Sequence, residues 1–315
     1  MSIVLSDNKI SPAIGANKCV AVFVGNDLVY GNVFDTQIDA YTGVTLQINT
    51  VSNVGGGTVN YAYIPDKLLI KDTDGNYTDY DVEKISAVPS SIQLLRLPKK
   101  LKMSDKQFRN LTSLNILVIS EGIKEITSQA FNNCTGLSEI TLPSTIKTIG
   151  GEAFVGNALQ KVNIKGLAVW CSIEGLYNLN STGPSNKKLY VNGNLIRDLY
   201  IPSSITSIAD YAFYNYAGNN FTSLTVPSTI KSVGKYAFPA NVFNNNCTPV
   251  SDNIRYAKSS TNSHFVLLGP QYYNSTTYTL NQDTKIIAGA AFNDCPRVES
   301  LTIPRGVTSI GNEAF

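Results

Sequence analysis

The sequence predicts a mainly β protein, in which a parallel β-solenoid follows a small β domain rich in hairpins. One 18-residue stretch, LSEITLPSTIKTIGGEAF at Leu137–Phe154, returns at Phe221–Phe238 and Val298–Phe315 with matching residue types. Phe131 and Phe154 are 23 residues apart, and a fixed period of this size is typical of a solenoid. The first 87 residues lack the repeat and contain β-branched runs separated by turn residues. Alanine-phenylalanine pairs close the copies, at Phe131, Phe154, Phe213, Phe238, Phe292 and Phe315.

Residues 1–87 are predicted to form the small β domain and to anchor the protein in a larger assembly. Hairpins are expected at Cys19–Gly31, Val44–Ile64 and Leu68–Ile85, since each stretch has two β-prone runs around Gly, Asn or Asp. The segment Asp72–Glu83 also has oxygen-bearing side chains at positions 1, 3, 5 and 12 of an EF-hand calcium loop. Because Tyr77 stands where that loop needs glycine and the flanks predict strands, a hairpin is favoured and calcium binding stays open.

Within each repeat, apolar residues recur 17, 14, 12, 8 and 5 positions before the closing phenylalanine. The pair at 14 and 12 alternates in period two, which predicts a short strand, and stacked strands would form a parallel sheet. Glycine four positions before the phenylalanine is expected to permit a tight turn, and the phenylalanines are expected to stack into an internal spine. Phe108, 23 residues before Phe131, indicates a degraded first copy. In the copy that ends at Phe154, the apolar residues are Leu137, Ile140, Leu142, Ile146 and Ile149.

Two gaps between phenylalanines are longer than a repeat and indicate insertions, near residues 165–194 and 239–276. They contain the sole tryptophan, Trp170, the sole histidine, His264, and several tyrosines. Aromatic side chains on protruding loops can stack on sugars or anchor protein partners. The alternative, favoured because Trp170 lies in the apolar run LAVW, is that these side chains seal the insertions against the flank of the solenoid.

The repeated phrase L-x-x-(I/L)-x-(I/L/V)-P-x-x-(I/V)-x-x-(I/V)-G-x-x-A-F resembles the BspA-type leucine-rich repeat. The resemblance extends to the two insertions, which look like long variants of the repeat. It implies a right-handed leucine-rich-repeat solenoid over residues 88–315 and a general surface-binding role. The last copy stops at Phe315, on the spine residue itself, so the array is expected to continue beyond it.

The outward positions of the predicted sheet form a hydroxyl-rich surface with little charge, and they are the candidate ligand contacts. In the first full copy the same positions are Ile116 and Val118, which are apolar, so this end of the sheet is expected to be covered by the N-terminal domain. The candidate ligand contacts are Glu139, Thr141, Asp198, Tyr200, Ser223, Thr225, Thr277, Thr279, Ser300 and Thr302.

Catalytic chemistry finds little support in this chain, and no cofactor or metal is expected. A single histidine and the absence of a CxxC pair leave few nucleophilic or metal-ligating arrangements. Glu139 and Asp198 are the only carboxylates at the outward positions, and a whole insertion separates them, which argues against a glycoside hydrolase. Cys134 and Cys295 occupy equivalent repeat positions that favour a small buried side chain, so no disulfide framework is expected.

The net charge of +2 is uneven, at −5 for residues 1–86 (ten acidic, five basic) and +7 for the rest (20 basic, 13 acidic). A basic cluster follows the N-terminal domain, and three interpretations stay open: a nucleic-acid patch, a solvated face, or a docking edge for the acidic N-terminal domain. No nucleic-acid partner is predicted. The cluster comprises Arg96, Lys99, Lys100, Lys102, Lys106 and Arg109.

A non-enzymatic structural and binding protein is the predicted function. The start MSIVLSDNKISPAIG lacks the regions of a signal peptide, and no apolar run is long enough to span a membrane. We therefore expect a bacteriophage virion fibre, of head or tail, that is a homo-oligomer. Its N-terminal domain would attach to other virion proteins, and its repeats would contact a host-surface protein or glycan. The alternative is a cell-surface or secreted adhesin of a bacterium or protist that binds host proteins.

Overall fold

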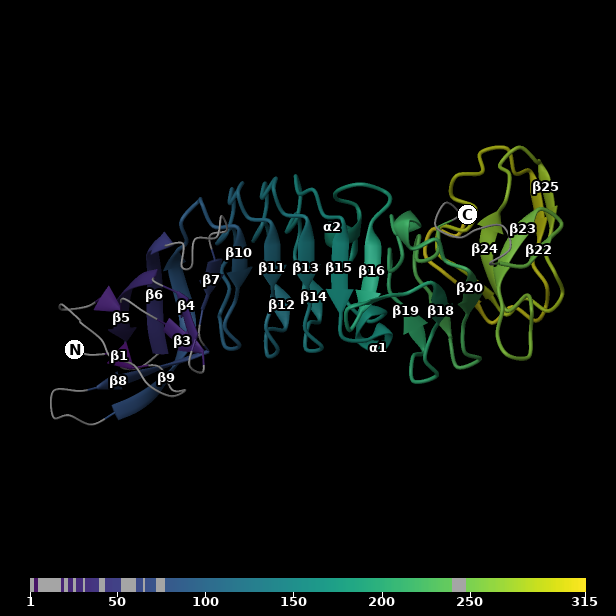
Figure 1. Cartoon of the computed structure of the whole chain (residues 1–315). Coiled ribbons are helices and arrows are strands. Elements are labelled where there is room, and N and C mark those ends of the chain that lie inside the picture. The colour runs from purple at the N-terminus through teal and green to yellow at the C-terminus, as the bar shows by residue number, and fades with distance from the viewer. Residues whose placement is uncertain are drawn as a thin grey trace. The chain divides into compact units, whose positions relative to one another are not determined.

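The computed structural model describes the backbone at 3–4, 18–19, 22–24, 27–30, 32–39, 43–51, 61–64, 66–71, 77–239 and 248–315 (Figure 1). Side chains are described at 64, 66–67, 81–85, 88–239 and 248–315. The chain forms two compact units, and each is treated by itself below. The first comprises Met1–Ile146 and Gly150–Leu159, and the second Lys147–Ile149 and Gln160–Phe315.

The first unit begins with a mixed sheet, ordered β1-β8-β9-β6-β5-β2, and a separate hairpin, β3–β4. Two of the three predicted hairpins are confirmed, since β3 pairs antiparallel with β4 and β8 with β9. Residues 72–76 of the candidate calcium loop lie outside the described residues. The strands are β1 (Ile3–Val4), β2 (Lys18–Cys19), β3 (Val22–Val24), β4 (Asp27–Tyr30), β5 (Asn32–Asp39), β6 (Gly43–Val51), β8 (Lys67–Lys71) and β9 (Tyr77–Ala87).

The predicted hairpin at Val44–Ile64 is wrong, because its two strands belong to different sheets. Strand β6 pairs antiparallel with β5 and parallel with β9. Strand β7 (Tyr61–Tyr63) instead pairs parallel with β10 (Leu94–Arg96), the first strand of the repeats. The parallel sheet of the repeats therefore extends back into the predicted N-terminal domain.

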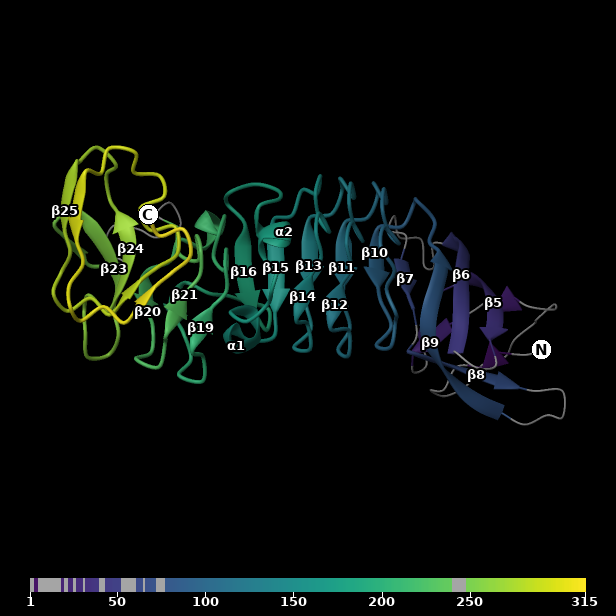
Figure 2. The same ribbon diagram turned by 180° about the vertical axis from the view of Figure 1, so that it is seen from behind.

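In the repeats of the first unit, strands β7, β10, β11 (Ile116–Val118) and β13 (Glu139–Thr141) follow one another in a parallel sheet (Figures 1 and 2). The central residue of each repeat strand is fully buried and its two neighbours are half-buried, which confirms the predicted alternation. A two-residue strand, β12 (Glu125–Ile126), follows β11. One turn of the solenoid, from strand to closing phenylalanine, is called a coil below.

The predicted phenylalanine spine is confirmed in both units, and it includes the degraded copy. In the first unit the ring of Phe131 stacks on Phe108, with centroids 5.2 Å apart, and on Phe154, at 5.6 Å. In the second unit Phe238 stacks on Phe213 at 5.3 Å, and Phe315 stacks on Phe292 at 5.8 Å. These ring planes lie within 13° of parallel, so each ring covers the next and excludes water from it.

The turn before each phenylalanine differs from the prediction. The left-handed residue lies two before the phenylalanine, hereafter position −2, and it is never glycine. Glycine at position −4 is needed instead for close approach, since a Cβ on Gly150 would lie 2.5 Å from the Ser128 nitrogen of the preceding coil. Gly234 meets the Asp210 nitrogen at the same distance. Position −2 has φ between 50° and 61° in Lys106, Gln129, Glu152, Tyr211, Tyr236, Ala290 and Glu313.

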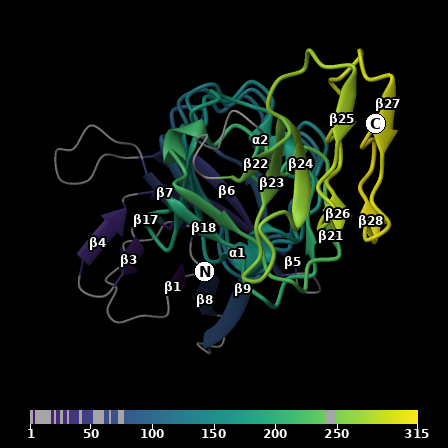
Figure 3. The same cartoon turned by 90° about the vertical axis from the view of Figure 1, so that its right-hand side faces the viewer.

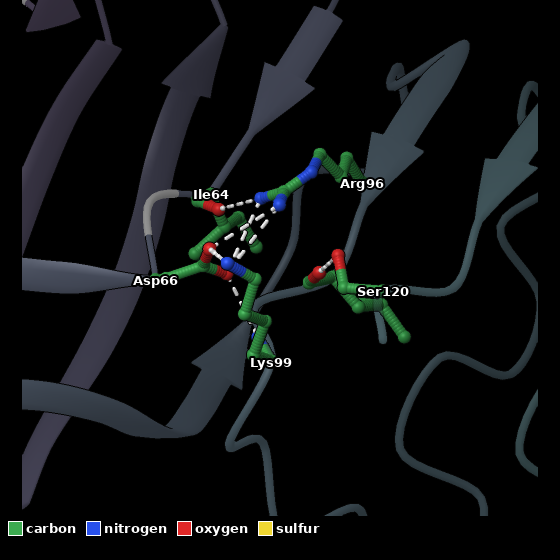
Figure 4. A network of polar contacts seen from close by, with 6 residues as sticks. Ile64, Asp66, Arg96, Lys99 and Ser120 are labelled. Atoms are coloured by element: carbon green, nitrogen blue, oxygen red, sulfur yellow. Dashed lines mark hydrogen bonds and ion pairs between the residues drawn. The ribbon is translucent and has the colours of Figure 1, made fainter. Parts of the chain in front are cut away.

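Salt bridges and hydrogen bonds attach the N-terminal domain to the first coil. Arg96 and Lys99 both contact the Asp66 carboxylate, and Arg96 also donates to the Ile64 carbonyl oxygen (Figure 4). Burial raises the pKa of Asp66, but the bonds from Lys99 and the charge of Arg96 outweigh it and lower that pKa overall. Two further pairs are Lys100 to Asp81 and Lys102 to Glu83, each at 2.6 Å.

The departure of the first copy from the repeat pattern has a structural reason. Gln107 stands where later copies have alanine, and its amide donates to the Ile85 carbonyl oxygen of β9 at 2.6 Å. The backbone N–H of Lys102 donates to the Glu83 carbonyl oxygen of the same strand. These contacts and the salt bridges support the docking-edge interpretation of four members of the basic cluster.

The second unit continues the repeats with short parallel pairs. Strand β15 pairs with β16, β18 with β20, β19 with β21, and β25 with β27, the last pair lying side by side in Figure 3. The elements of the first half are β14 (Thr148–Ile149), β15 (Lys161–Ile164), α1 (Leu167–Trp170), α2 (Tyr177–Asn180), β16 (Lys188–Val191), β17 (Asn194–Leu195), β18 (Asp198–Tyr200), β19 (Ser207–Ile208), a 3₁₀ helix (Ala217–Asn219), β20 (Ser223–Thr225) and β21 (Ser232–Val233).

The second predicted insertion forms an antiparallel β22–β23–β24 meander that continues through parallel β26 and β28. It makes up most of a five-stranded sheet, so the insertion adds to the core of this unit. Tyr256 in β23 is fully buried, and so is Leu267 in β24. The elements are β22 (Val250–Ser251), β23 (Ile254–Ala257), β24 (Val266–Pro270), β25 (Thr277–Thr279), β26 (Ile286–Ile287), β27 (Ser300–Thr302) and β28 (Ser309–Ile310).

The first insertion is sealed against its own unit, as the favoured alternative for Trp170 predicts. Trp170 is fully buried, its indole N–H donates to the Ala212 carbonyl oxygen at 2.8 Å, and its ring meets Tyr216 edge-on. The buried Asn180 accepts a hydrogen bond from the Tyr216 hydroxyl and donates to the Tyr211 carbonyl oxygen. Trp170 is therefore a core residue and is not available to a ligand.

Replacing Phe131 with alanine should destabilise the protein far more than the same change at Phe315. Phe131 is fully buried between two rings, so we expect a loss of about 3–5 kcal/mol of unfolding free energy. Phe315 is 57% exposed and has one stacking partner, so we expect a loss of less than about 1 kcal/mol. Urea denaturation of both variants measures the difference, and equal losses would contradict the spine.

Gly150→Ala should also destabilise the protein, although alanine is the better residue for an ordinary backbone. Its Cβ would meet the backbone of the preceding coil, which cannot move aside as a side chain can, at an expected cost of about 1–3 kcal/mol. Gly166→Ala is the matched control, because no atom lies within 4 Å of its Cβ position. Thermal unfolding of the two variants tests this, and a Gly150→Ala protein as stable as the control would show that the coils do not approach so closely.

Candidate functional site

The outward positions predicted as ligand contacts are brought together only in part. Glu139 and Thr141 lie half-buried on β13, in the first unit. In the second unit the hydroxyl-rich positions form two separate groups, one on β18 and β20 and one on β25 and β27. Thr225 of β20 bridges to Lys258 of the second insertion, so β20 and β25 are not paired. The predicted face is therefore divided by the insertion.

On β18 and β20 the polar side chains bond mainly to one another. Asp198 accepts hydrogen bonds from the Thr222 hydroxyl at 2.6 Å and the Ser223 hydroxyl at 2.8 Å, and these bonds lower its pKa. Tyr200 lies beside them and is 66% exposed. On β25 and β27 the positions Thr277, Thr279, Ser300 and Thr302 are exposed. Contact of these residues with a ligand stays a prediction.

Ile116 and Val118, the predicted inter-domain contacts, are half-buried on β11 on either side of the fully buried Leu117. The described bonds between the N-terminal domain and the repeats run through Arg96, the lysines that follow it and Gln107. Cover of Ile116 and Val118 by the N-terminal domain remains a prediction.

A row of tyrosine rings marks a different surface of the second unit, along position −2. Tyr211 and Tyr236 occupy this position in neighbouring coils, with ring centroids 5.4 Å apart. Tyr177 of α2 packs against Tyr211 at 4.8 Å, and Tyr214 packs against both Tyr211 and Tyr236. The left-handed backbone at position −2 therefore displays a continuous aromatic surface.

The row is interrupted at the next coil, where position −2 is Ala290. The small side chain leaves a hollow of about 420 Å³, called the recess below. A volume of this size is in the range of small-molecule sites. Lys235, the residue before Tyr236, forms a salt bridge at 2.5 Å with Glu313, the position −2 residue of the coil that ends at Phe315. The recess is bordered by Tyr214, Tyr236, Arg255, Tyr273, Ala290 and Asp294, among others.

Arg255 is the cation of the recess and is almost completely buried. Its side chain lies on β23, and its Nη2 donates to the Pro270 carbonyl oxygen at 3.2 Å. Its Nε has no hydrogen-bond partner among the described residues. Burial lowers the pKa of Arg255, and the neighbouring Tyr273 opposes that shift.

The rim of the recess is aromatic and polar. Tyr273 is 46% exposed; burial raises its pKa, while Arg255 acts to lower it. The hydroxyl of Tyr236 accepts a hydrogen bond from the Asn293 amide at 2.9 Å. Asp294 is exposed beside it. Flat rings, a buried cation and exposed oxygens allow the recess to bind a ligand with both apolar and polar faces.

The histidine and the three cysteines whose side chains the structure describes are engaged in packing or local bonds. The His264 ring packs edge-on against Tyr256, and its Nδ1 bonds to the Ser263 hydroxyl. Burial raises the pKa of the Cys134 and Cys295 thiols to about 11 and that of Cys171 to about 12, so these thiols stay protonated at neutral pH. Among the described residues, no group of three or more His, Cys, Asp or Glu side chains is placed to hold a metal ion. Nor does any helix in the described part of the chain have the length and apolarity to cross a membrane.

Comparison with known proteins decides the family. Residues 90–172 and 186–315 match the family model of the BspA type leucine rich repeat region, in six copies. The chain belongs to the BspA-type leucine-rich repeat family. The unmatched residues between these ranges fall inside the first insertion, where α2 lies. No curated protein matched this BspA-type sequence.

Three solved structures are similar to this BspA-type chain. A leucine rich cell surface protein from Faecalibacterium prausnitzii is 19% identical, with 96% of this chain and 75% of that chain covered and a TM-score of 0.37. A leucine-rich repeat protein from Eubacterium ventriosum is 19% identical, with 79% of this chain and 60% of that chain covered and a TM-score of 0.34. A leucine-rich repeat protein from Bacteroides ovatus is 16% identical, with 90% of this chain and 78% of that chain covered and a TM-score of 0.41. The chain thus spans between 60% and 78% of the length of these proteins.

Sequence reasoning missed the recess because it compared the strand positions and did not compare position −2. When the copies are aligned on their closing phenylalanines, position −2 of three successive copies is Tyr211, Tyr236 and Ala290. This pattern predicts a row of aromatic side chains that is interrupted at the third of these copies. Arg255 had no such signal, since it lies in an insertion that has no counterpart in the other coils.

Proposed function

We propose that this BspA-type protein is a non-enzymatic binding protein that holds its ligand in the recess between Tyr236 and Arg255. The observation that carries the proposal is the gap at Ala290 in a row of tyrosine rings that pack on one another at tilted angles. Tyrosine offers a large rigid contact area together with a hydroxyl, which favours binding surfaces. The repeat core fixes the coils that hold these rings, so the site is formed before the ligand arrives.

The setting is part of the same proposal. With only 15% charged residues and 17 tyrosines, the composition suits a surface outside the cell or on a virion. In either setting the N-terminal domain attaches and the repeats are presented, as a cell-surface adhesin or as the phage fibre expected from the sequence. Labelling bacterial cells and phage particles with an antibody against this chain separates the two settings.

Ala290→Tyr should abolish ligand binding without harming the fold. Tyrosine already occupies the same left-handed position at Tyr211 and Tyr236, with φ of 58° and 50°, so a third ring fits the backbone and fills the recess. We expect binding of the labelled full-length chain to a panel of bacterial and epithelial cells to fall at least roughly tenfold, about 1.4 kcal/mol. Flow cytometry measures the binding.

The matched control is Gln129→Tyr, which adds a tyrosine at position −2 of a coil that does not border the recess. This variant should bind as the unaltered protein does, and both variants should keep the unaltered melting temperature. Unchanged binding by Ala290→Tyr, or an unaltered protein that binds none of the surfaces, would contradict the proposal.

A further inference from the structure

We propose that the recess recognises the carboxylate of an acidic saccharide, and that Arg255 is the group that pairs with it. This inference rests on the proposed function and names the ligand class of the same site. It follows from the state of Arg255, from the strand that positions it, and from the side chains around it.

The first argument is the unbalanced charge of Arg255. The residue is 8% exposed, so its guanidinium has lost most of its hydration. Among the described residues its guanidinium donates one hydrogen bond, to the Pro270 carbonyl oxygen, and none of the ion pairs there involves it. A buried charge without a partner is costly, and a buried polar group without a bond indicates a missing anion or water. A carboxylate matches the planar fork of arginine with two parallel bonds.

The second argument is the strand irregularity that positions Arg255. The pairing of β23 with β24 shifts between Arg255 and Tyr256, which leaves Leu268 of β24 as the extra residue. Bulges of this kind redirect side chains and are frequent beside binding sites. Leu268 borders the recess together with Arg255. The next residue, Gly269, has φ of 131°, and a Cβ there would lie 2.6 Å from the Ala291 carbonyl oxygen. The absence of a side chain at Gly269 thus lets β24 approach Ala291, which also borders the recess.

The third argument concerns the rest of the ligand. Tyr236 and Tyr273 border the recess, so their rings offer flat faces to the apolar side of a sugar ring and their hydroxyls offer polar partners to its hydroxyl groups. Asp294 places a negative charge at the same recess. That charge disfavours a dianion such as phosphate or a peptide with many acidic residues, because like charges repel. A ligand with one carboxylate and several hydroxyl groups fits both charges, and this is the chemistry of an acidic saccharide.

The test compares acidic probes with neutral counterparts on the full-length chain. The pairs are 3′-sialyllactose against lactose, and galacturonate against its methyl ester, so that each acidic probe carries one carboxylate; an aspartate-rich peptide is the competing class. We expect at least one acidic saccharide to bind roughly tenfold tighter than its neutral counterpart, measured by calorimetry. Arg255→Met should remove that difference, while the control Arg305→Gln, at an exposed arginine, should keep it.

A second variant keeps the test valid if Arg255→Met does not fold. Asp294→Asn removes a repulsive charge from an exposed position, so it should widen the difference in affinity between the acidic probe and its neutral counterpart. Equal affinity for acidic and neutral saccharides, binding of the peptide alone, or an acidic preference that survives Arg255→Met would overturn the inference. A protein that binds cells in the recess but no acidic saccharide would overturn the ligand class alone, whereas a protein that binds no surface would overturn the proposed function.

Discussion

The close approach of each coil to the coil before it is the constraint on which the rest of the structure depends. In the coils that end at Phe154, Phe238 and Phe315 the contact is made by a glycine. A Cβ on Gly150 would lie 2.5 Å from the Ser128 nitrogen, and one on Gly311 would lie 2.3 Å from the Gly289 nitrogen. The closing phenylalanines of these coils stack on those of the preceding coils at 5.3–5.8 Å, so close backbone contact and ring stacking occur together.

The same constraint leaves position −2 free to vary. Its backbone is left-handed in every copy, yet its side chain takes no part in the spine, so lysine, glutamine, glutamate, tyrosine and alanine all occur there. A tyrosine in two neighbouring coils places two rings in contact, with centroids 5.4 Å apart, and an alanine in the next coil borders the recess. The repeat therefore creates a specific surface by changing one residue per coil while the core stays the same.

Features that recur along the chain could be predicted from the sequence, and features made by a single contact could not. The strands, the buried central residues and the phenylalanine spine follow from period and polarity alone, because every coil repeats them. The role of glycine at position −4 was misassigned, since a sequence does not show how near the preceding coil lies. The pairing of β7 with β10 and the bulge opposite Arg255 depend on distant segments, so no local pattern announces them.

A crystal structure of the full-length chain soaked with the acidic saccharide that binds best would test the central claim most directly. The account predicts density for the sugar in the recess, with its carboxylate on the Arg255 guanidinium and its ring against Tyr236, while Tyr211 and Tyr236 remain in contact. A recess filled by a side chain of the protein, or an Arg255 guanidinium paired with an acidic residue of the chain, would contradict it.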